Sequence, residues 1–256
     1  MTMCTLALYF HALESYPLIV AANRDEFFDR PSAPPQVLLR QPLVFGGKDL
    51  QSGGTWLGVN QYGLLAGILN RRSHTEAKRA TARSRGLLCL DILTARDPLA
   101  ACALLGEERG SHYQPFNLLF ADKERAYVAY NLGEEISWVE LEKGLHVLGN
   151  TAVYDTHSEK VQHAYRLFSR AADRLGRNPN SPPSWLAPLQ AALRDHSLAD
   201  DSNEPKGAIC VHTESYGTVS SSIIIYAEAE RRFAAYHASG PPCRDDFKGP
   251  VAVEVP

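Results

Sequence analysis

The sequence predicts an α+β fold made of layers that contain antiparallel sheets, and two observations support this class. Blocks of strand-like segments alternate with blocks of helix-like segments, in place of repeated strand–helix–strand units. The chain also lacks a glycine-rich phosphate loop, a dinucleotide fingerprint and a repeat of solenoid period. Its 256 residues, 45% hydrophobic and 21% charged, are ordinary for a globular protein. We expect residues 1–256 to form a single domain.

The first seventy residues are expected to be mostly strand. Apolar segments at 3–10 and 18–22 are separated by a connection of hairpin length, and the second is rich in β-branched residues. The proline-rich stretch Pro31-Ser32-Ala33-Pro34-Pro35 is expected to be a rigid extended loop. Glycine spacing typical of tight β turns and a further apolar run predict strand segments at 44–49, 53–60 and 63–70.

The remaining chain is expected to alternate between helices and strands. Helical spacing predicts two helices at 83–95 and 98–106, and two more at 158–175 and 184–194. Strands are expected at 116–122, 126–131, 136–140, 144–149, 208–212, 219–227 and 232–237. The polar stretch 198–206 is expected to be a surface loop.

Charge and composition exclude several classes of function. A net charge of −3 gives no general attraction to nucleic acid or to an anionic membrane. No apolar run approaches the roughly eighteen residues of a membrane span, and no convincing signal peptide is present, so we expect a cytoplasmic protein. The expected partner is a small-molecule substrate or a hydrophobic ligand. The oligomeric state is not predicted.

The cysteines and histidines show no metal-binding spacing. The five cysteines are scattered without a C-x-x-C pair, and the nine histidines include no H-x-x-x-H pair. An odd, dispersed set of cysteines argues against both a disulfide framework and a zinc site. We therefore expect no metal and no cofactor.

The segment Asn23-Arg24-Asp25-Glu26 is the most informative candidate for chemistry. If the first two strands pair as a hairpin, the end of the second lies beside the start of the first, and Cys4 lies next to Arg24 and Asp25. A neighbouring cation favours thiolate, and a carboxylate can orient a proton acceptor, so this thiol is a plausible nucleophile. The alternative is a core cysteine beside a solvated turn.

Three predicted strands end at or near an asparagine, namely Asn23, Asn70 and Asn150. Asparagine amides in such positions could donate hydrogen bonds to a developing oxyanion. Asparagine also ends strands commonly because its side chain closes turns, and for any single residue that explanation is preferred.

Several short motifs together resemble the NRDE family, also called the transport and Golgi organisation two family. They are Met3-Cys4-Thr5, Ala22-Asn23-Arg24-Asp25-Glu26-Phe27, Gly53-Gly54-Thr55-Trp56-Leu57-Gly58, Leu69-Asn70, Gly149-Asn150-Thr151 and Tyr216-Gly217-Thr218. This family is similar to N-terminal-nucleophile hydrolases of the cholylglycine hydrolase and penicillin V acylase group. The resemblance implies a four-layer α-β-β-α sandwich of antiparallel sheets.

The resemblance also implies roles for individual residues. Cys4 matches the nucleophile, its free α-amine would accept the thiol proton, and Asp25 would position that amine. Asn70 and Asn150 match the oxyanion donor and the active-site amide, and Arg24 belongs to the same catalytic set. The expected substrate-binding residues are Asn23, Glu26 and Trp56, with Trp56 packing as a pocket wall.

Three departures from the family pattern bear on function. The chain begins Met1-Thr2-Met3, so Cys4 becomes N-terminal only if translation starts at Met3 or the Met3–Cys4 bond is cut; otherwise no N-terminal nucleophile exists. Val219 replaces an arginine that commonly follows Tyr-Gly-Thr, and Arg24 falls one residue from the hydrolases' first-strand arginine.

Three functions therefore remain open. The expected function is hydrolysis of a linear, non-peptide amide through an acyl-enzyme on Cys4. The alternatives are a non-catalytic carrier or chaperone of a small hydrophobic ligand such as haem or an acyl group, in line with haem trafficking, and a purely structural or interaction protein.

Overall fold

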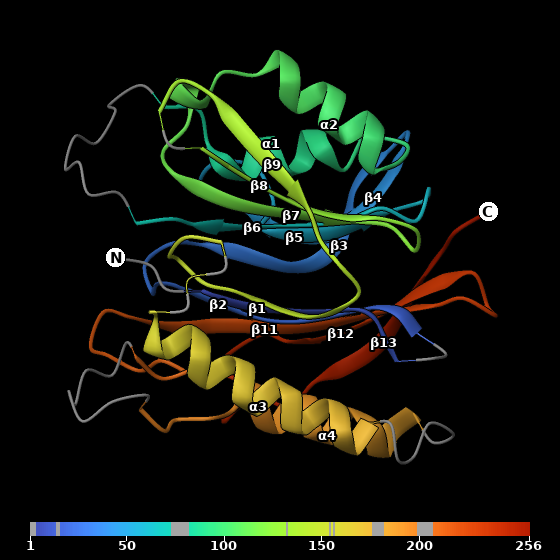
Figure 1. Ribbon diagram of the computed structural model, residues 1–256. Coiled ribbons are helices and arrows are strands. Elements are labelled where there is room, and N and C mark those ends of the chain that lie inside the picture. Colours follow the sequence, from blue (N-terminus) through green and yellow to red (C-terminus); the bar gives the residue numbers. More distant parts are fainter. Residues whose placement is uncertain are drawn as a thin grey trace.

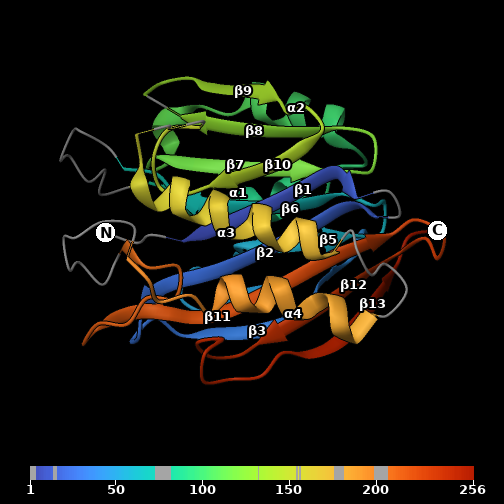
Figure 2. The same cartoon turned by 60° about the horizontal axis from the view of Figure 1, so that its bottom comes forward.

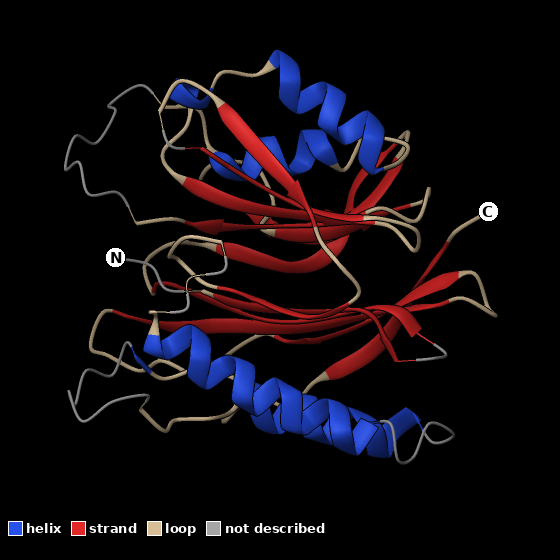
Figure 3. Cartoon of the chain, viewed as in Figure 1, coloured by secondary structure: helices blue, strands red, loops and turns tan. Residues whose placement is uncertain are grey.

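The computed structural model describes residues 4–13, 16–72, 82–131, 133–153, 155, 157–175, 182–198 and 207–256. Two antiparallel sheets stack face to face, and helices cover the outer face of each, which confirms the predicted four-layer α-β-β-α sandwich (Figures 1 and 3). No helix within these ranges is both long enough and apolar enough to cross a bilayer.

The first sheet, called sheet A, has the strand order β10-β1-β2-β11-β12-β13. Its strands are β1 (Thr5–Leu13), β2 (Tyr16–Phe27), β10 (Gly144–Leu148), β11 (Tyr216–Ala227), β12 (Arg232–Ala238) and β13 (Lys248–Glu254). Helices α3 (Glu159–Leu175) and α4 (Pro182–Leu193) lie across its outer face (Figure 2).

The second sheet, called sheet B, follows the chain order from β3 to β9. Its strands are β3 (Ser32–Arg40), β4 (Leu43–Asp49), β5 (Leu57–Asn60), β6 (Leu65–Asn70), β7 (Phe116–Ala121), β8 (Ala126–Asn131) and β9 (Ile136–Glu140). Helices α1 (Arg85–Ile92) and α2 (Pro98–Glu107) cover its outer face, and a 3₁₀ turn at Gly110–His112 precedes β7.

Strand alternation divides the apolar side chains among three cores. Even-numbered residues of β1 and β2, such as Leu8 and Val20, point toward sheet B, whereas odd-numbered residues such as Tyr9 and Ile19 pack under α3 and α4. A third core fills the space between sheet B and helices α1 and α2. Both faces of each sheet are therefore buried over much of their area, which explains the near-continuous apolar runs in the sequence.

Two predictions of local structure were wrong. Residues 31–35 do not form a loop, because Ser32 begins β3. That strand lies at the edge of sheet B, where prolines without a backbone N–H are tolerated, and its register shifts between Ala33 and Gln36, across Pro34 and Pro35. Residues 208–212 do not form a regular strand, since only His212 makes an isolated bridge, to Gly217. Most of the predicted loop 198–206 lies outside the described residues.

Candidate active site

The β1–β2 hairpin brings Cys4 beside Asp25. Thr5 pairs with Asn23 across the two antiparallel strands, so Cys4, one residue earlier, lies next to Arg24 and Asp25. The backbone N–H of Asp25 donates to Cys4 Sγ at 3.3 Å, and the thiol donates to the Asp25 carbonyl oxygen at 3.5 Å. The predicted proximity of these residues is confirmed.

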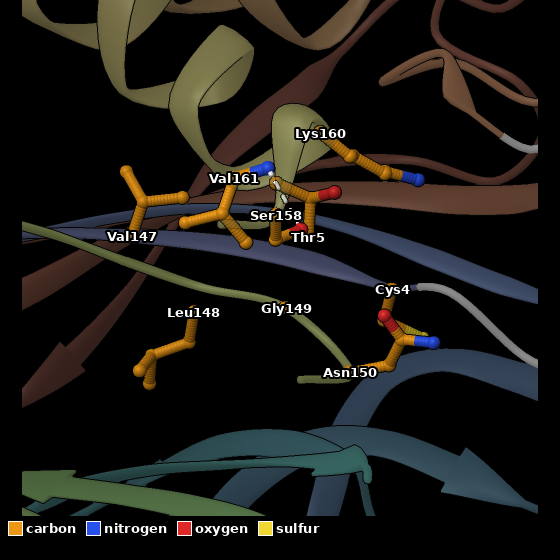
Figure 4. A pocket seen from close by; sticks show the side chains of 9 residues that line it. All are labelled: Cys4, Thr5, Val147, Leu148, Gly149, Asn150, Ser158, Lys160 and Val161. Atoms are coloured by element: carbon orange, nitrogen blue, oxygen red, sulfur yellow. Dashed lines mark hydrogen bonds between the residues drawn. The ribbon is translucent and has the colours of Figure 1, made fainter. Parts of the chain in front are cut away.

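Cys4 lines a small cavity of about 220 Å³, where the start of β1, the end of β10 and the first turn of α3 meet (Figure 4). Lys160 and Asn150 extend into this region from different elements, and their polar ends lie on the same side as Cys4. The lining residues are Cys4, Thr5, Val147, Leu148, Gly149, Asn150, Ser158, Lys160 and Val161.

Asn150 presents an amide group to this cavity. The residue is 5% exposed, and its Nδ2 has no hydrogen-bond partner among the described residues. Its backbone is held firmly, because its carbonyl oxygen accepts from Arg72 N at 2.6 Å, and the Asn117 side chain donates to the carbonyls of Gly149 and Thr151. A buried amide donor without a partner is costly, which is typical of a group that serves a ligand.

Asp25 is fully buried and lies between a hydroxyl and an amine. Thr218 Oγ1 donates to Asp25 Oδ1 at 2.6 Å, and Lys160 Nζ lies 3.7 Å from Asp25 Oδ2. Burial raises the pKa of Asp25 to about 6, against the opposing effects of Lys160 and Thr218. Burial also lowers the pKa of Lys160, although Asp25 acts in the opposite direction. Burial therefore brings the pKa values of the Asp25 carboxyl and the Lys160 amine closer together.

The thiol of Cys4 is held in its neutral form. Burial raises its pKa to about 12, the negative charge of Asp25 adds to this effect, and Arg24 has only a weak opposing effect. This is the reverse of the thiolate stabilisation predicted from the sequence. Desolvation dominates because the sulfur lies between two packed sheets, where ionisation without a nearby proton acceptor is unfavourable.

Arg24 is directed toward Trp56. Its guanidinium carbon lies 4.4 Å from the centre of the Trp56 ring, and Nη1 donates to Ser32 Oγ at 3.3 Å. Trp56 packs against the core between the sheets, as Cys4 does, but it lines a second cavity and not the one at Cys4. Glu26 accepts from the backbone N–H of Phe27 and lies 3.8 Å from Arg30.

Of the predicted site residues, only Cys4 and Asn150 line the cavity. The others do not, namely Asn23, Arg24, Asp25, Glu26, Trp56 and Asn70. Asn23 faces the helices, where its Nδ2 donates to the carbonyls of Leu193 and Ile209 and its Oδ1 accepts from Ser221. Asn70 pairs with Phe116, whose ring packs beneath α1 and α2, so the Cβ of Asn70 is on that outer face of sheet B. The structure thus brings together Cys4, Asp25 and Asn150, but not all the predicted residues.

Three residues near Cys4 and Asp25 were not predicted from the sequence, namely Lys160, Thr218 and Arg85. Lys160 enters the cavity because Ser158 Oγ accepts from Val161 N and so caps the first turn of α3. Arg85, the first residue of α1, is half-buried, and its positive charge lies close enough to interact with Cys4. Thr218 belongs to the Tyr-Gly-Thr motif, which was the one available signal for it. Val219 occupies the register irregularity that follows Thr218.

The comparisons agree with this architecture. A family model described as Transport and Golgi organisation 2 matches residues 3–236. The human Transport and Golgi organization protein 2 homolog is 33% identical over 232 residues, which cover 82% of each chain.

Two solved structures show the same fold at low sequence identity. They are a Caenorhabditis elegans N-acylethanolamine-hydrolyzing acid amidase ortholog (TM-score 0.56, 13% identity, covering 87% of this chain and 92% of that one) and penicillin V acylase from Agrobacterium tumefaciens (TM-score 0.55, 13% identity, covering 92% and 83%). The chain thus belongs to the Transport and Golgi organisation 2 family and has the fold of N-terminal-nucleophile hydrolases.

Proposed function

We propose that this protein hydrolyses a linear, non-peptide amide through the thiol of Cys4. The observation that carries this proposal is the shared cavity of Cys4 and Asn150, in which the buried Asn150 amide has no partner among the described residues. A thiol and an adjacent amide donor are the two groups that acyl transfer requires.

The proposed reaction begins with a chain in which Cys4 is the N-terminal residue. Its α-amine takes the thiol proton, and Sγ attacks the amide carbonyl carbon while Asn150 Nδ2–H donates to the developing oxyanion. The C–N bond then breaks, the leaving amine takes that proton, and a thioester remains on Cys4. A water molecule, deprotonated by the same α-amine, attacks the thioester carbonyl; the sulfur departs as thiolate, takes up the proton, and the carboxylic acid leaves.

The raised pKa of Cys4 supports the requirement for a nearby base. A thiol with a pKa of about 12 is protonated at neutral pH, whereas an α-amine has an unperturbed pKa of roughly 7.7 to 8.0. An amine beside the sulfur would accept the proton during attack. Asp25 would position the resulting ammonium, in the region where its carboxyl already lies near Lys160.

A second cavity lies between the sheets. Trp56, Phe45 and Ile224 form part of its wall, so its lining is largely apolar. Apolar walls of this kind suit the hydrophobic acyl group of an amide substrate.

The test compares chains that begin at Cys4 with chains that retain residues 1–3. Both are assayed with N-acylethanolamines and penicillin V, the compounds named for the two structural neighbours, and intact mass detects an acyl adduct. We expect turnover only from chains with a free Cys4 α-amine, none after Cys4→Ala, and normal turnover after Cys102→Ala in α2. Loss of the Asn150 donor should lower kcat about 10²–10³-fold.

A carrier function is the second candidate, favoured by the apolar cavity between the sheets and by the neutral thiol. The name of the human relative refers to transport, and a carrier needs no thiolate. If no amide or ester is turned over, and an acyl ligand binds equally to wild type and Cys4→Ala, the hydrolase proposal is refuted and the carrier function is supported.

A further inference from the structure

Two cysteines and two histidines meet on the helix-covered side of sheet A, outside the cavity at Cys4. They are His196, Cys210, His212 and Cys243, and one ligand atom from each lies within 4.8 Å of all the others. They come from three connections: His196 follows α4, Cys210 and His212 precede β11, and Cys243 lies between β12 and β13. This Cys₂His₂ composition is that of structural zinc sites in proteins.

Of three ligand-atom separations, two match those around a tetrahedral zinc ion and the third is shorter. Cys210 Sγ lies 3.7 Å from Cys243 Sγ and 3.6 Å from His212 Nε2, and His212 Nε2 lies 3.2 Å from Cys243 Sγ. Zinc–sulfur bonds of about 2.3 Å and zinc–nitrogen bonds of about 2.0–2.1 Å at tetrahedral angles place such atoms about 3.6–3.8 Å apart. The two sulfur atoms are far beyond the roughly 2.05 Å of a disulfide bond.

His196 has the tautomer that a metal ligand needs. Its Nδ1 lies 3.1 Å from the carbonyl oxygen of Cys210. Because a carbonyl oxygen only accepts hydrogen bonds, Nδ1 carries the hydrogen, and Nε2 is left with a free lone pair. A ring nitrogen that donates to a backbone carbonyl is the usual outer-shell arrangement of zinc-bound histidine.

The three connections are also tied together by the protein itself. Cys210 N donates to the carbonyl of Asp195 at 2.8 Å, which fixes the cysteine beside the segment that follows α4. Arg194 Nε donates to the carbonyl of Pro242 at 2.6 Å, which fixes the residue before Cys243. These contacts hold the ligands close together, so ion binding requires little further ordering of the chain.

The cluster is connected to Asp25 through two residues, Val211 and Thr218. Val211, between Cys210 and His212, donates its N–H to Thr218 Oγ1 at 2.9 Å and accepts from Thr218 N at 2.8 Å. The Thr218 hydroxyl in turn donates to Asp25 Oδ1. The position of the Cys210–His212 segment therefore sets the position of the hydroxyl that orients the buried carboxyl.

We propose that His196, Cys210, His212 and Cys243 bind one structural Zn²⁺ ion, which clamps the segment before β11 and thereby holds Thr218 against Asp25. Four protein ligands fill the tetrahedral shell and leave no position for water, so the ion is structural and not catalytic. The proposal does not depend on the hydrolase activity.

The test measures metal in the full chain, purified without a histidine tag and under reducing conditions. Elemental analysis should find about one zinc per chain in wild type and in Cys102→Ser, a half-buried cysteine of α2 that serves as the matched control. Cys243→Ser and His212→Gln should lose the ion. Loss of one outer-shell partner typically lowers affinity 10–100-fold, so loss of a ligand should weaken zinc binding more than about 100-fold.

A second measurement keeps the proposal testable if a variant fails to fold. Co²⁺ added to metal-free wild type should give the visible spectrum of tetrahedral cobalt with thiolate ligands, and Zn²⁺ should displace it. The proposal is overturned if wild type neither retains nor takes up metal, or if Cys243→Ser binds as much zinc as wild type. It is also overturned if mass spectrometry finds a Cys210–Cys243 disulfide in the reduced preparation.

Discussion

Replacing Asp25 by asparagine should remove a pH-dependent cost to stability. Burial raises the pKa of Asp25 from 3.8 to about 6, and this difference of about 2 corresponds to about 3 kcal/mol. Because the folded-state pKa is the higher one, the folded state binds the proton more tightly than the unfolded state does. Asp25 therefore favours folding below pH 3.8, and this contribution is lost as the pH rises through about 6.

The magnitude can be measured in an accessible pH range. Roughly 1 kcal/mol of the effect is already lost at pH 4.5, so about 2 kcal/mol remains to be lost between pH 4.5 and 7.5. Relative to Asp25→Asn, the free energy of unfolding of wild type should fall by about that amount over this range. The asparagine keeps an oxygen that can accept from Thr218, so the variant removes the charge and retains the hydrogen bond.

Urea unfolding followed by circular dichroism at several pH values measures the difference between the two proteins. In the Asp25→Asn variant, Lys160 loses its carboxylate partner. Because burial lowers the folded-state pKa of Lys160, its titration makes the variant more stable as the pH rises. This effect increases the expected difference between the variant and wild type. Asp29→Asn, in the exposed turn after β2, is the matched control, and its curve should run parallel to wild type. If the free energies of unfolding of Asp25→Asn and wild type change with pH in parallel, ionisation of the buried Asp25 carboxyl does not destabilise the folded protein, and the reasoning is refuted.

Three further substitutions test contacts that hold the fold together. Asn60→Ala should lower the free energy of unfolding by about 3 kcal/mol, because its amide donates to the Leu93 and Ala95 carbonyls after α1 and these would remain buried without a donor; a loss below about 1 kcal/mol in urea unfolding would refute this. Gly54→Ala should destabilise by about 1–3 kcal/mol or more, because the added methyl group collides with the Gly86 carbonyl backbone, and an unchanged melting temperature would contradict the contact. Asn117→Ala should free the segment 149–151, so hydrogen exchange there should accelerate while exchange in β11 stays slow; equal acceleration in both would indicate general destabilisation.

The sequence was sufficient for the parts of the site that depend on local pairing. Cys4 and Asp25 meet because a hairpin fixes the register of neighbouring strands, which is readable from two apolar runs and a short connection. Lys160 could not be foreseen, since its place depends on how α3 packs across sheet A. The orientation of Asn70 depends on strand alternation, because a shift of one residue along the strand moves a side chain to the opposite face of the sheet.

The cysteine–histidine cluster shows the same limit. Its members are separated by 14, 2 and 31 positions and lie in irregular segments, so no ligand spacing appears in the sequence. Proline in β3 was similarly misread because the sequence does not show that this strand lies at an edge, where its missing donor is tolerated.

The order in which the chain is synthesised separates Cys4 from its partners in time. The cysteine is synthesised well before Asn150, Lys160 and Thr218, which follow it in the chain by 146, 156 and 214 residues. A peptidase that acts on the nascent chain would therefore meet residues 1–3 before the cavity exists. Self-cleavage, in contrast, would have to wait for the completed sandwich. The timing of N-terminal processing relative to folding, followed by pulse labelling, would distinguish the two routes by which Cys4 could acquire a free amine.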